Sequence, residues 1–353
     1  MIAAPPASPT LLTDEPREDW ARWLPWVGAL GSLLLTLCWL GRPQLWTDEA
    51  ATISASTRSL PQLFALVGNI DGVHALFYLL LWGWVHLTGV SEVAVRLPAA
   101  LAAAAAVGVA AEYLRRRLGP VQAGCGAALM FFLPRVLWSG TEARSYSLIL
   151  LCAVLSGIAL ARWMRTGRGL LAYGVAALLS LGFSVLTATL IFTVPGLILL
   201  GVLGVERLPR RWGATVATGL VVLLCLPGIA AAASPTAKDR TVGYRQFAEL
   251  EATTSAVLYT TAQARGISIA YPERTRQVRD VFETGTPAAT DSLWGTVASP
   301  ARQREIAERI TGSLTLVSPP YRNEELAGIL RGHCRPGAAL ESPRYRVSTW
   351  DCD

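Results

Sequence analysis

The residues best suited to chemistry stand directly after the first apolar run of the chain. Asp48 and Glu49 are adjacent in the segment WTDEA, and Asp71 and His74 follow in the same polar stretch, just before a second apolar run. A carboxylate can remove a proton or bind a hard divalent cation. Ionisable side chains beside a bilayer are costly, so those that are present are functional candidates by default. We therefore predict that Asp48 is a catalytic base, with Glu49 as a second catalytic candidate and Asp71 and His74 as substrate-binding residues.

A third polar cluster lies in the segment EARSY, between two later apolar runs, and contributes Glu142 and Arg144. An arginine can bind a phosphate through two parallel hydrogen bonds. A base, a phosphate-binding arginine and a membrane together predict transfer from a lipid-phosphate donor, provided that the clusters meet above a lipid-accessible groove. Whether a divalent metal ion takes part is left open, and its candidate ligands are Asp48 and Glu142.

Each of these residues also has a structural alternative. Asp48 fits a helix N-terminus, where the helix dipole favours negative charge. Asp71 fits the Asp-Gly turn that it forms with its neighbour. His74 fits a helix cap or a contact with lipid headgroups, and Glu142 and Arg144 fit an ion pair with each other.

The composition is that of a membrane protein. Of the 353 residues, 52% are hydrophobic and only 16% are charged, and several apolar runs reach the roughly 20 residues that a helix needs to cross a bilayer. The net charge of +6 is concentrated in short arginine clusters between these runs. Such clusters are typical of cytoplasmic loops, and we predict no nucleic-acid partner.

The apolar runs predict an α-helical polytopic protein with seven spans. The run at 74–87 is short, so it either crosses the membrane or lies in the interface as a juxtamembrane helix. The second alternative keeps the arginines at 115–117 in the cytoplasm, and we prefer it. The predicted spans are 24–40, 97–114, 121–138, 146–164, 170–184, 186–205 and 213–233, after a disordered cytoplasmic tail at 1–22.

The long loop at 41–96, on the outer side, carries two signals for helix starts. Thr47 is a candidate N-cap for a helix whose first turn holds Asp48. Ser59 and Gln62 have the spacing of a capping box. These helices are expected to lie along the membrane surface.

The chain becomes polar from residue 234 to its last residue, 353. Apolar segments at 257–259, 314–317 and 345–350 read as strands, and segments at 303–310 and 324–332 read as helices. This alternation predicts a small α/β domain outside the cell. In that compartment a disulfide between Cys334 and Cys352 is one of two alternatives, the other being free thiols.

The ordered set of motifs resembles the GT-C superfamily of membrane glycosyltransferases. The motifs are WTDEA after the first run, then HALFY and GVSEVAVRLPAAL. The similarity is to the family 39 type, which includes protein O-mannosyltransferases and the lipid A aminoarabinose transferase. The segment EARSYSL is similar to the second outer loop of actinobacterial members. The resemblance covers residues 24–233, and the ordered set is more specific than any single motif.

The resemblance implies an inverting transferase in a bacterial plasma membrane, with its active face outside. The donor would be a polyprenyl-phosphate hexose, such as mannose, and the acceptor a hydroxyl of an envelope glycan, lipid or protein. By this likeness Asp48 deprotonates the acceptor, and Arg144, helped by Arg96, neutralises the leaving phosphate. Glu142 matches an acidic position that binds a metal or the acceptor in some relatives.

The chain departs from the family pattern because it passes to the polar domain after the seventh predicted span. Family members usually carry further spans. A catalytically inactive scaffold or partner subunit is therefore the alternative function. A transporter ranks last, since it predicts ionisable residues near mid-span.

Overall fold

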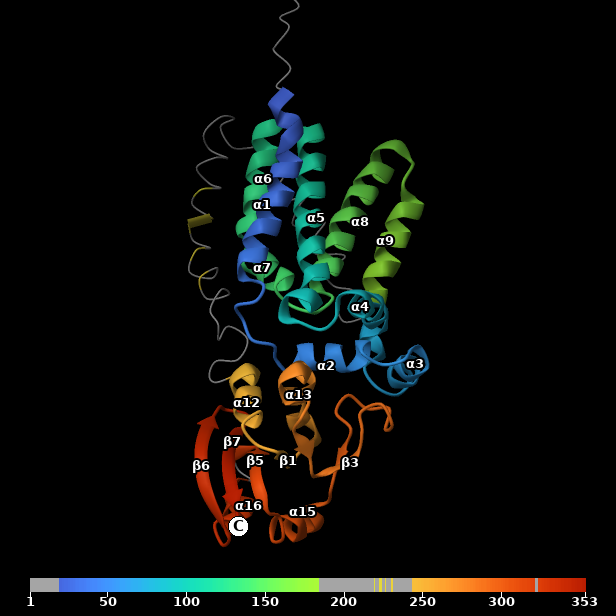
Figure 1. Ribbon diagram of the computed structural model, residues 1–353. Helices are drawn as coiled ribbons and strands as arrows, with labels where there is room; N and C mark the ends of the chain where they lie inside the picture. The colour runs from blue at the N-terminus through green and yellow to red at the C-terminus, as the bar shows by residue number, and fades with distance from the viewer. Residues whose placement is uncertain are drawn as a thin grey trace, which may run out of the picture.

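The computed structural model describes residues 19–183, 243–320 and 323–353, with the isolated residues 219, 222, 223, 226 and 230. The described parts form three regions (Figure 1). Long helices run side by side in a bundle, short helices lie across one end of that bundle, and a mixed α/β domain lies beyond them.

The bundle is built from the apolar runs. A short 3₁₀ helix, η1 (Asp19–Trp23), leads into α1 (Leu24–Trp39), which is followed in the bundle by α5 (Glu92–Leu118), α6 (Pro120–Phe132), α7 (Pro134–Gly140), α8 (Tyr146–Thr166) and α9 (Leu170–Phe183). Ser91 caps α5, because its side chain accepts a hydrogen bond from the N–H of Ala94. The packing of α5 on α1 is close: a Cβ at Gly108 would lie 3.0 Å from the Cβ of Ala29.

Three helices in the described residues are long and apolar enough to cross a membrane: residues 20–39, 92–118 and 146–166. A fourth span results if α6 and α7, bent by 62° at their junction, are taken together. The predicted total of seven spans is therefore not confirmed. The helix α9 is apolar but shorter, and the predicted spans at 186–205 and 213–233 lie outside the described ranges.

The run predicted as a single span at 121–138 is broken into α6 and α7, which form either one bent span or a re-entrant pair. Pro134 has no N–H to continue the helix, and its ring disfavours helical geometry in the residue before it. Leu133 accordingly adopts an extended conformation, with φ −66° and ψ 118°. The chain resumes as α7, which begins at Pro134.

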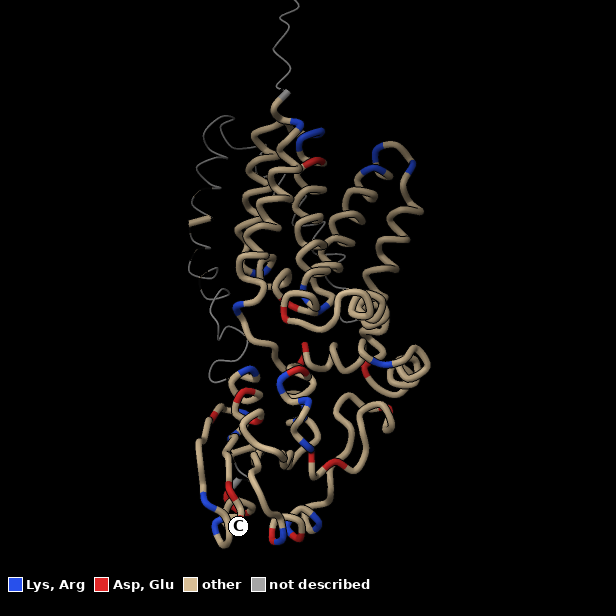
Figure 2. Tube along the Cα trace, viewed as in Figure 1, with Lys and Arg blue, Asp and Glu red and all other residues tan. Residues whose placement is uncertain are grey.

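The outer surface of the bundle is apolar where a bilayer would contact it. Large side chains there are strongly exposed, among them Trp26, Leu30, Leu171 and Leu178. Basic residues gather at the end of the bundle remote from the α/β domain (Figure 2). Among them are Arg115, Arg116 and Arg117 in the last turn of α5. This distribution of apolar and basic side chains is that of a membrane-associated bundle.

The layer across the end of the bundle contains α2 (Thr47–Ser56), α3 (Leu60–Asn69), the 3₁₀ turn η2 (Gly72–His74) and α4 (Ala75–Thr88). The capping box of α3 is confirmed for Ser59 and Gln62. The N-cap predicted for α2 is wrong: Trp46 is the cap residue, and Thr47 is the first helical residue. The crosswise direction of α4 fits the interfacial alternative for the run at 74–87 (Figure 1).

The α/β domain contains the predicted alternation of strands and helices. Its main sheet has the order β2-β1-β5-β7-β6, in which β1 is parallel to β2 and β5, whereas β7 is antiparallel to β5 and β6. The elements are α12 (Tyr244–Glu251), β1 (Ala256–Tyr259), η4 (Ala262–Arg265), α13 (Gly266–Ala270), α14 (Pro272–Thr275), β2 (Arg279–Asp280), β3 (Glu283–Gly285), β4 (Thr296–Val297), α15 (Pro300–Ala307), β5 (Gly312–Ser318), α16 (Asn323–Leu330), β6 (Cys334–Glu341) and β7 (Arg346–Cys352).

Alternate residues of β1 point to opposite faces of this sheet, as the period of a strand requires. Leu258 packs with residues of α15 and α16, whereas Val257 and Tyr259 join a core that extends to α12, α13 and α2. One continuous core therefore unites the α/β domain with the layer of short helices.

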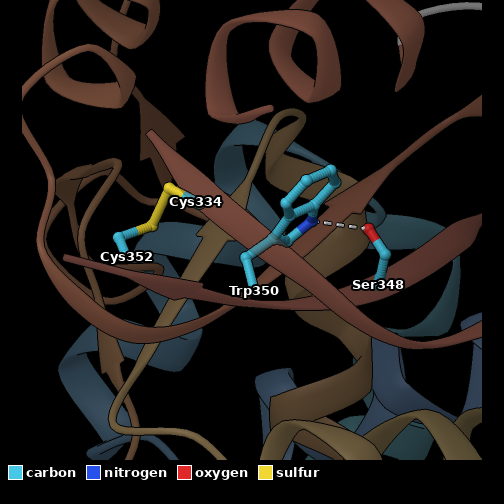
Figure 3. The surroundings of a disulfide bond; sticks show 4 residues. All are labelled: Cys334, Ser348, Trp350 and Cys352. Atoms are coloured by element: carbon cyan, nitrogen blue, oxygen red, sulfur yellow. Dashed lines mark hydrogen bonds between the residues drawn. A yellow bond between two sulfur atoms is a disulfide. The ribbon is translucent and has the colours of Figure 1, made fainter. Parts of the chain in front are cut away.

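The outermost hairpin, β6–β7, is closed by a disulfide between Cys334 and Cys352 (Figure 3). Trp350 lies on the same strand as Cys352, and its Nε1–H donates to Ser348 at 2.9 Å. Of the two alternatives that the sequence left open for these cysteines, the disulfide is the one present. Its loop of 18 residues restricts the unfolded chain, which in the chain-entropy model stabilises the fold by about 3 kcal/mol.

Polar contacts fasten the α/β domain to the other two regions. Arg245 donates to Glu92 at 2.6 Å, and the hydroxyl of Tyr271 donates to the same carboxylate at 2.6 Å. Tyr271 also accepts from the N–H of Leu45 at 3.0 Å. Glu92 begins the long helix α5, so these bonds fix the domain against the end of the bundle.

Candidate active site

Asp48 is the one residue of α2 that is not buried. The helix packs against α13 and α4 and lies between the bundle and the α/β domain (Figure 1), yet 38% of the Asp48 side chain is exposed. The carboxylate lies in the first turn of α2, where the dipole of the helix favours negative charge. A half-exposed acid on an otherwise buried helix is available to a ligand.

Arg144 lies beside this carboxylate, with its Nη2 3.3 Å from Oδ2 of Asp48. Only 10% of the Arg144 side chain is exposed, and its Nη1 lies 3.5 Å from the hydroxyls of both Thr52 and Tyr78. Burial opposes the positive charge, but the nearby Tyr78 and Asp48 outweigh it and raise the pKa of Arg144. The guanidinium therefore keeps its charge in a site that is largely shielded from water.

Tyr78 connects Arg144 to the second predicted pair. Its hydroxyl donates a short hydrogen bond to Oδ2 of Asp71, and Oδ1 of Asp71 lies 3.9 Å from Nε2 of His74. Asp71 has a left-handed backbone, with φ 61°, in the turn before η2. Burial and the charge of Arg144 lower the pKa of His74, which makes the imidazole neutral at pH 7.

These contacts bring together residues from three separate stretches of the chain. Asp48 comes from α2, Asp71 and His74 from the turn around η2, and Arg144 from the loop after α7. The predicted meeting of the first and third polar clusters is therefore present for Asp48 and Arg144. We call Asp48, Asp71, His74, Tyr78 and Arg144 the open cluster.

Glu49 and Arg96 form a second, closed pair on the inner side of α2. Nε and Nη2 of Arg96 each donate to a different oxygen of Glu49 at 2.7 Å, and both side chains are fully buried. Arg96 also donates to the carbonyl oxygens of Leu40, Pro43 and Gln44. The pair thus ties the connection between α1 and α2 to α5.

The closed pair also positions the open cluster. The N–H of Ala143, next to Arg144, donates to Oε1 of Glu49 at 2.8 Å. Glu49 therefore holds the loop that carries Arg144 against α2. These contacts fit a positioning role for Glu49 and Arg96, and the direct catalytic and phosphate-binding roles stay predictions.

Glu142 is buried in the same loop, only 1% exposed. Its backbone carbonyl accepts from the N–H of Arg144 at 2.8 Å. In the described part of the chain, the carboxylates of Asp48 and Glu142 belong to no group of three or more potential ligands; the group found is His333, Cys334 and Cys352. Those cysteines are in the disulfide. The participation of a metal ion, which the sequence left open, therefore stays open, and we derive no step from a metal.

Sequence reasoning missed three contributors to the site. Thr52 lies one turn after Asp48 in the same helix, and Tyr78 ends the HALFY motif, but neither was named as a site residue. Arg135 is exposed at the start of α7, and its Cζ lies 5.5 Å from the centre of the Tyr146 ring. Tyr146 is the first residue of α8, directly after the loop that carries Arg144. The helix-breaking Pro134 beside Arg135 was the available signal, because broken spans frequently surround membrane sites.

The chain matches none of the protein-family models, curated proteins or solved structures with which it was compared.

Proposed function

We propose that the protein is an inverting glycosyltransferase that moves a hexose from a polyprenyl phosphate to a hydroxyl acceptor at the outer face of a bacterial plasma membrane. The ion pair between Asp48 and Arg144 carries the proposal. It places a half-exposed carboxylate and a buried cation side by side at the end of an apolar bundle. The lipid-accessible groove that the donor needs stays a prediction.

In the proposed reaction Asp48 accepts the proton of the acceptor hydroxyl as its oxygen attacks the anomeric carbon. The bond between that carbon and the phosphate oxygen breaks, and the phosphate leaves with the electron pair. Arg144 then binds the negative charge that develops on the leaving group. One carboxylate suffices because the phosphate leaves without an added proton, unlike the two-carboxylate arrangement of glycoside hydrolases.

The neighbourhood of Arg144 supports a phosphate that arrives from the lipid side. Arg135 stands exposed above the Tyr146 ring, at the break within a bent pair of apolar helices. A second guanidinium at this boundary would guide an anionic headgroup toward Arg144. The exposed leucines and tryptophans of the bundle provide the surface along which a polyprenyl chain would lie.

The test is transfer from labelled polyprenyl-phosphate mannose and glucose by the full chain in detergent. Asp48→Asn should lower kcat/KM by about 10²- to 10⁴-fold, the usual contribution of a general base. Arg144→Ala should lower kcat as well as donor binding. Asp351→Asn, which removes an exposed acid on β7 of the α/β domain, is the matched control and should transfer normally.

Two results would change the assignment. Normal transfer by Asp48→Asn would remove Asp48 as the base. No transfer by the wild-type chain from any donor would favour the inactive scaffold.

A further inference from the structure

The turn between β6 and β7 reaches from the α/β domain to the first residue of α2. Nη1 of Arg344, in this turn, donates to the hydroxyl of Thr47 at 2.8 Å, and 297 positions separate the two residues in the chain. Thr47 directly precedes Asp48. The α/β domain thus places a guanidinium on the residue that precedes the proposed catalytic base.

The turn is fixed at its base and across the hairpin. The hydroxyl of Ser342 accepts from the N–H groups of Arg344 and Tyr345, at 3.3 and 3.0 Å, and the N–H of Ser342 donates to the carbonyl of Tyr345 at 2.8 Å. Tyr345 is buried against the ring of Tyr244, with ring centres 6.4 Å apart. Arg344 is therefore presented by an ordered turn.

The charge of Arg344 is not neutralised by any carboxylate within 4 Å among the described residues. Its hydrogen bond goes to a neutral hydroxyl, and its side chain is exposed. Arg245, which also joins the domain to the bundle region, is instead paired with Glu92 at 2.6 Å. Arg245 therefore completes a docking contact, whereas Arg344 keeps its charge available to a ligand.

We propose that Arg344 binds a carboxylate or phosphate of the acceptor, so that the acceptor is an acidic molecule bearing the reactive hydroxyl. This inference rests on the proposed function. A guanidinium can bind either anion through two parallel hydrogen bonds. Because Thr47 and Asp48 are consecutive, Arg344 and Asp48 can contact the anionic group and the hydroxyl of one sugar-sized molecule.

Binding measurements test this assignment without turnover. The full chain in nanodiscs is titrated with phenyl glucuronide, phenyl glucoside 6-phosphate and the neutral phenyl glucoside. The wild-type protein should bind at least one anionic probe about tenfold or more tightly than the neutral one, and the pair of anions shows whether carboxylate or phosphate is preferred.

The variants separate charge from docking. Arg344→Gln can still donate to Thr47 but lacks the charge, so it should fold normally and lose the anionic preference. Arg344→Lys should keep part of it. Tyr244→Phe removes the other hydroxyl bonded to Thr47, at 2.9 Å, and Arg335→Ala removes an exposed arginine elsewhere on β6; both should keep the full preference.

Equal binding of neutral and anionic probes by the wild type would overturn the inference. An anionic preference that survives Arg344→Gln would overturn it as well. If that surviving preference were lost in Arg144→Ala, the probe would occupy the proposed donor site instead. Absence of sugar transfer would bear on the proposed function alone, because these titrations do not require it.

Discussion

The two adjacent acids of α2 lie in regions of opposite character. Glu49 is fully buried, with both oxygens bonded to Arg96 and one also bonded to the N–H of Ala143. Asp48 is 38% exposed and faces Arg144 at the longer distance of 3.3 Å. One turn of helix thus supplies a closed pair on its inner side and an open cluster on its outer side.

The difference shows how to assign roles to ionisable residues near a membrane. A buried ion pair whose donors are fully used by the protein fixes the backbone around it, and that is a structural task. A half-exposed acid beside a shielded cation retains capacity for a ligand. The closed pair then serves the open cluster, because Glu49 holds the loop that carries Arg144.

The largest loss of stability is expected for Arg96→Ala. Removing one partner of a buried pair leaves Glu49 as an uncompensated charge, which should lower the free energy of unfolding by about 3–5 kcal/mol. Thermal unfolding in detergent measures the effect, and Arg144→Ala, from the more open site, should cost much less.

A double variant sharpens the result. Glu49→Leu combined with Arg96→Met removes both charges, so it should be more stable than Arg96→Ala alone. A melting temperature of Arg96→Ala equal to that of the wild type would show that the pair does not support the fold.

Glu251 in the α/β domain is a third kind of acid, because it is buried and has no cation within 4 Å among the residues that the structure describes. Its Oε2 accepts from the hydroxyl of Tyr259 at 2.7 Å, and burial raises its pKa to about 8 from an ordinary value of 4.5. Between these values the folded protein keeps a proton that the unfolded chain releases. The free energy of unfolding should therefore fall as pH rises through this window, by roughly 5 kcal/mol at most.

Glu251→Gln cannot ionise, so it should flatten this pH dependence and be more stable than the wild type near pH 8. Unfolding followed at several pH values between 5 and 8 measures it. Glu308→Gln, at an exposed position, should leave the wild-type slope unchanged; an equal slope in Glu251→Gln would mean that another group is responsible.

Much of this architecture could be predicted from local patterns. The apolar runs predicted α1, α5 and α8, the Ser59–Gln62 spacing predicted the start of α3, and alternation predicted the α/β domain. The approach of Asp48 to Arg144 was also predicted, because both follow apolar runs that end on the same side.

The remaining features depend on tertiary contacts that no local pattern encodes. Thr47 has the chemistry of an N-cap, but its hydroxyl bonds to Tyr244 and Arg344, which are distant in sequence. The sequence alone does not distinguish Glu49 from Asp48. In the structure the buried Arg96 pairs with Glu49 and leaves Asp48 partly exposed. The break at Pro134 was readable in principle, yet the surrounding run is apolar enough to resemble one straight span.

The subtlest test of the open cluster is Tyr78→Phe. The tyrosine hydroxyl donates to Asp71 and lies 3.5 Å from Nη1 of Arg144, so the variant leaves both charged groups with one partner fewer. Hydrogen bonds to charged groups contribute about 1.5–3 kcal/mol, which predicts a loss of transfer of roughly 10- to 100-fold. Steady-state kinetics with labelled donor measures this loss.

The effect of Tyr78→Phe should differ from that of Arg96→Ala in kind. Because the closed pair does not contact Tyr78, thermal stability should fall far less than in Arg96→Ala, and the loss should appear in transfer. Thr88→Val, at an exposed hydroxyl at the end of α4, should have no effect on either. If Tyr78→Phe instead melted early and transferred sugar normally for its folded fraction, Tyr78 would belong to the structural core, and Asp71 and His74 would lose their link to the site.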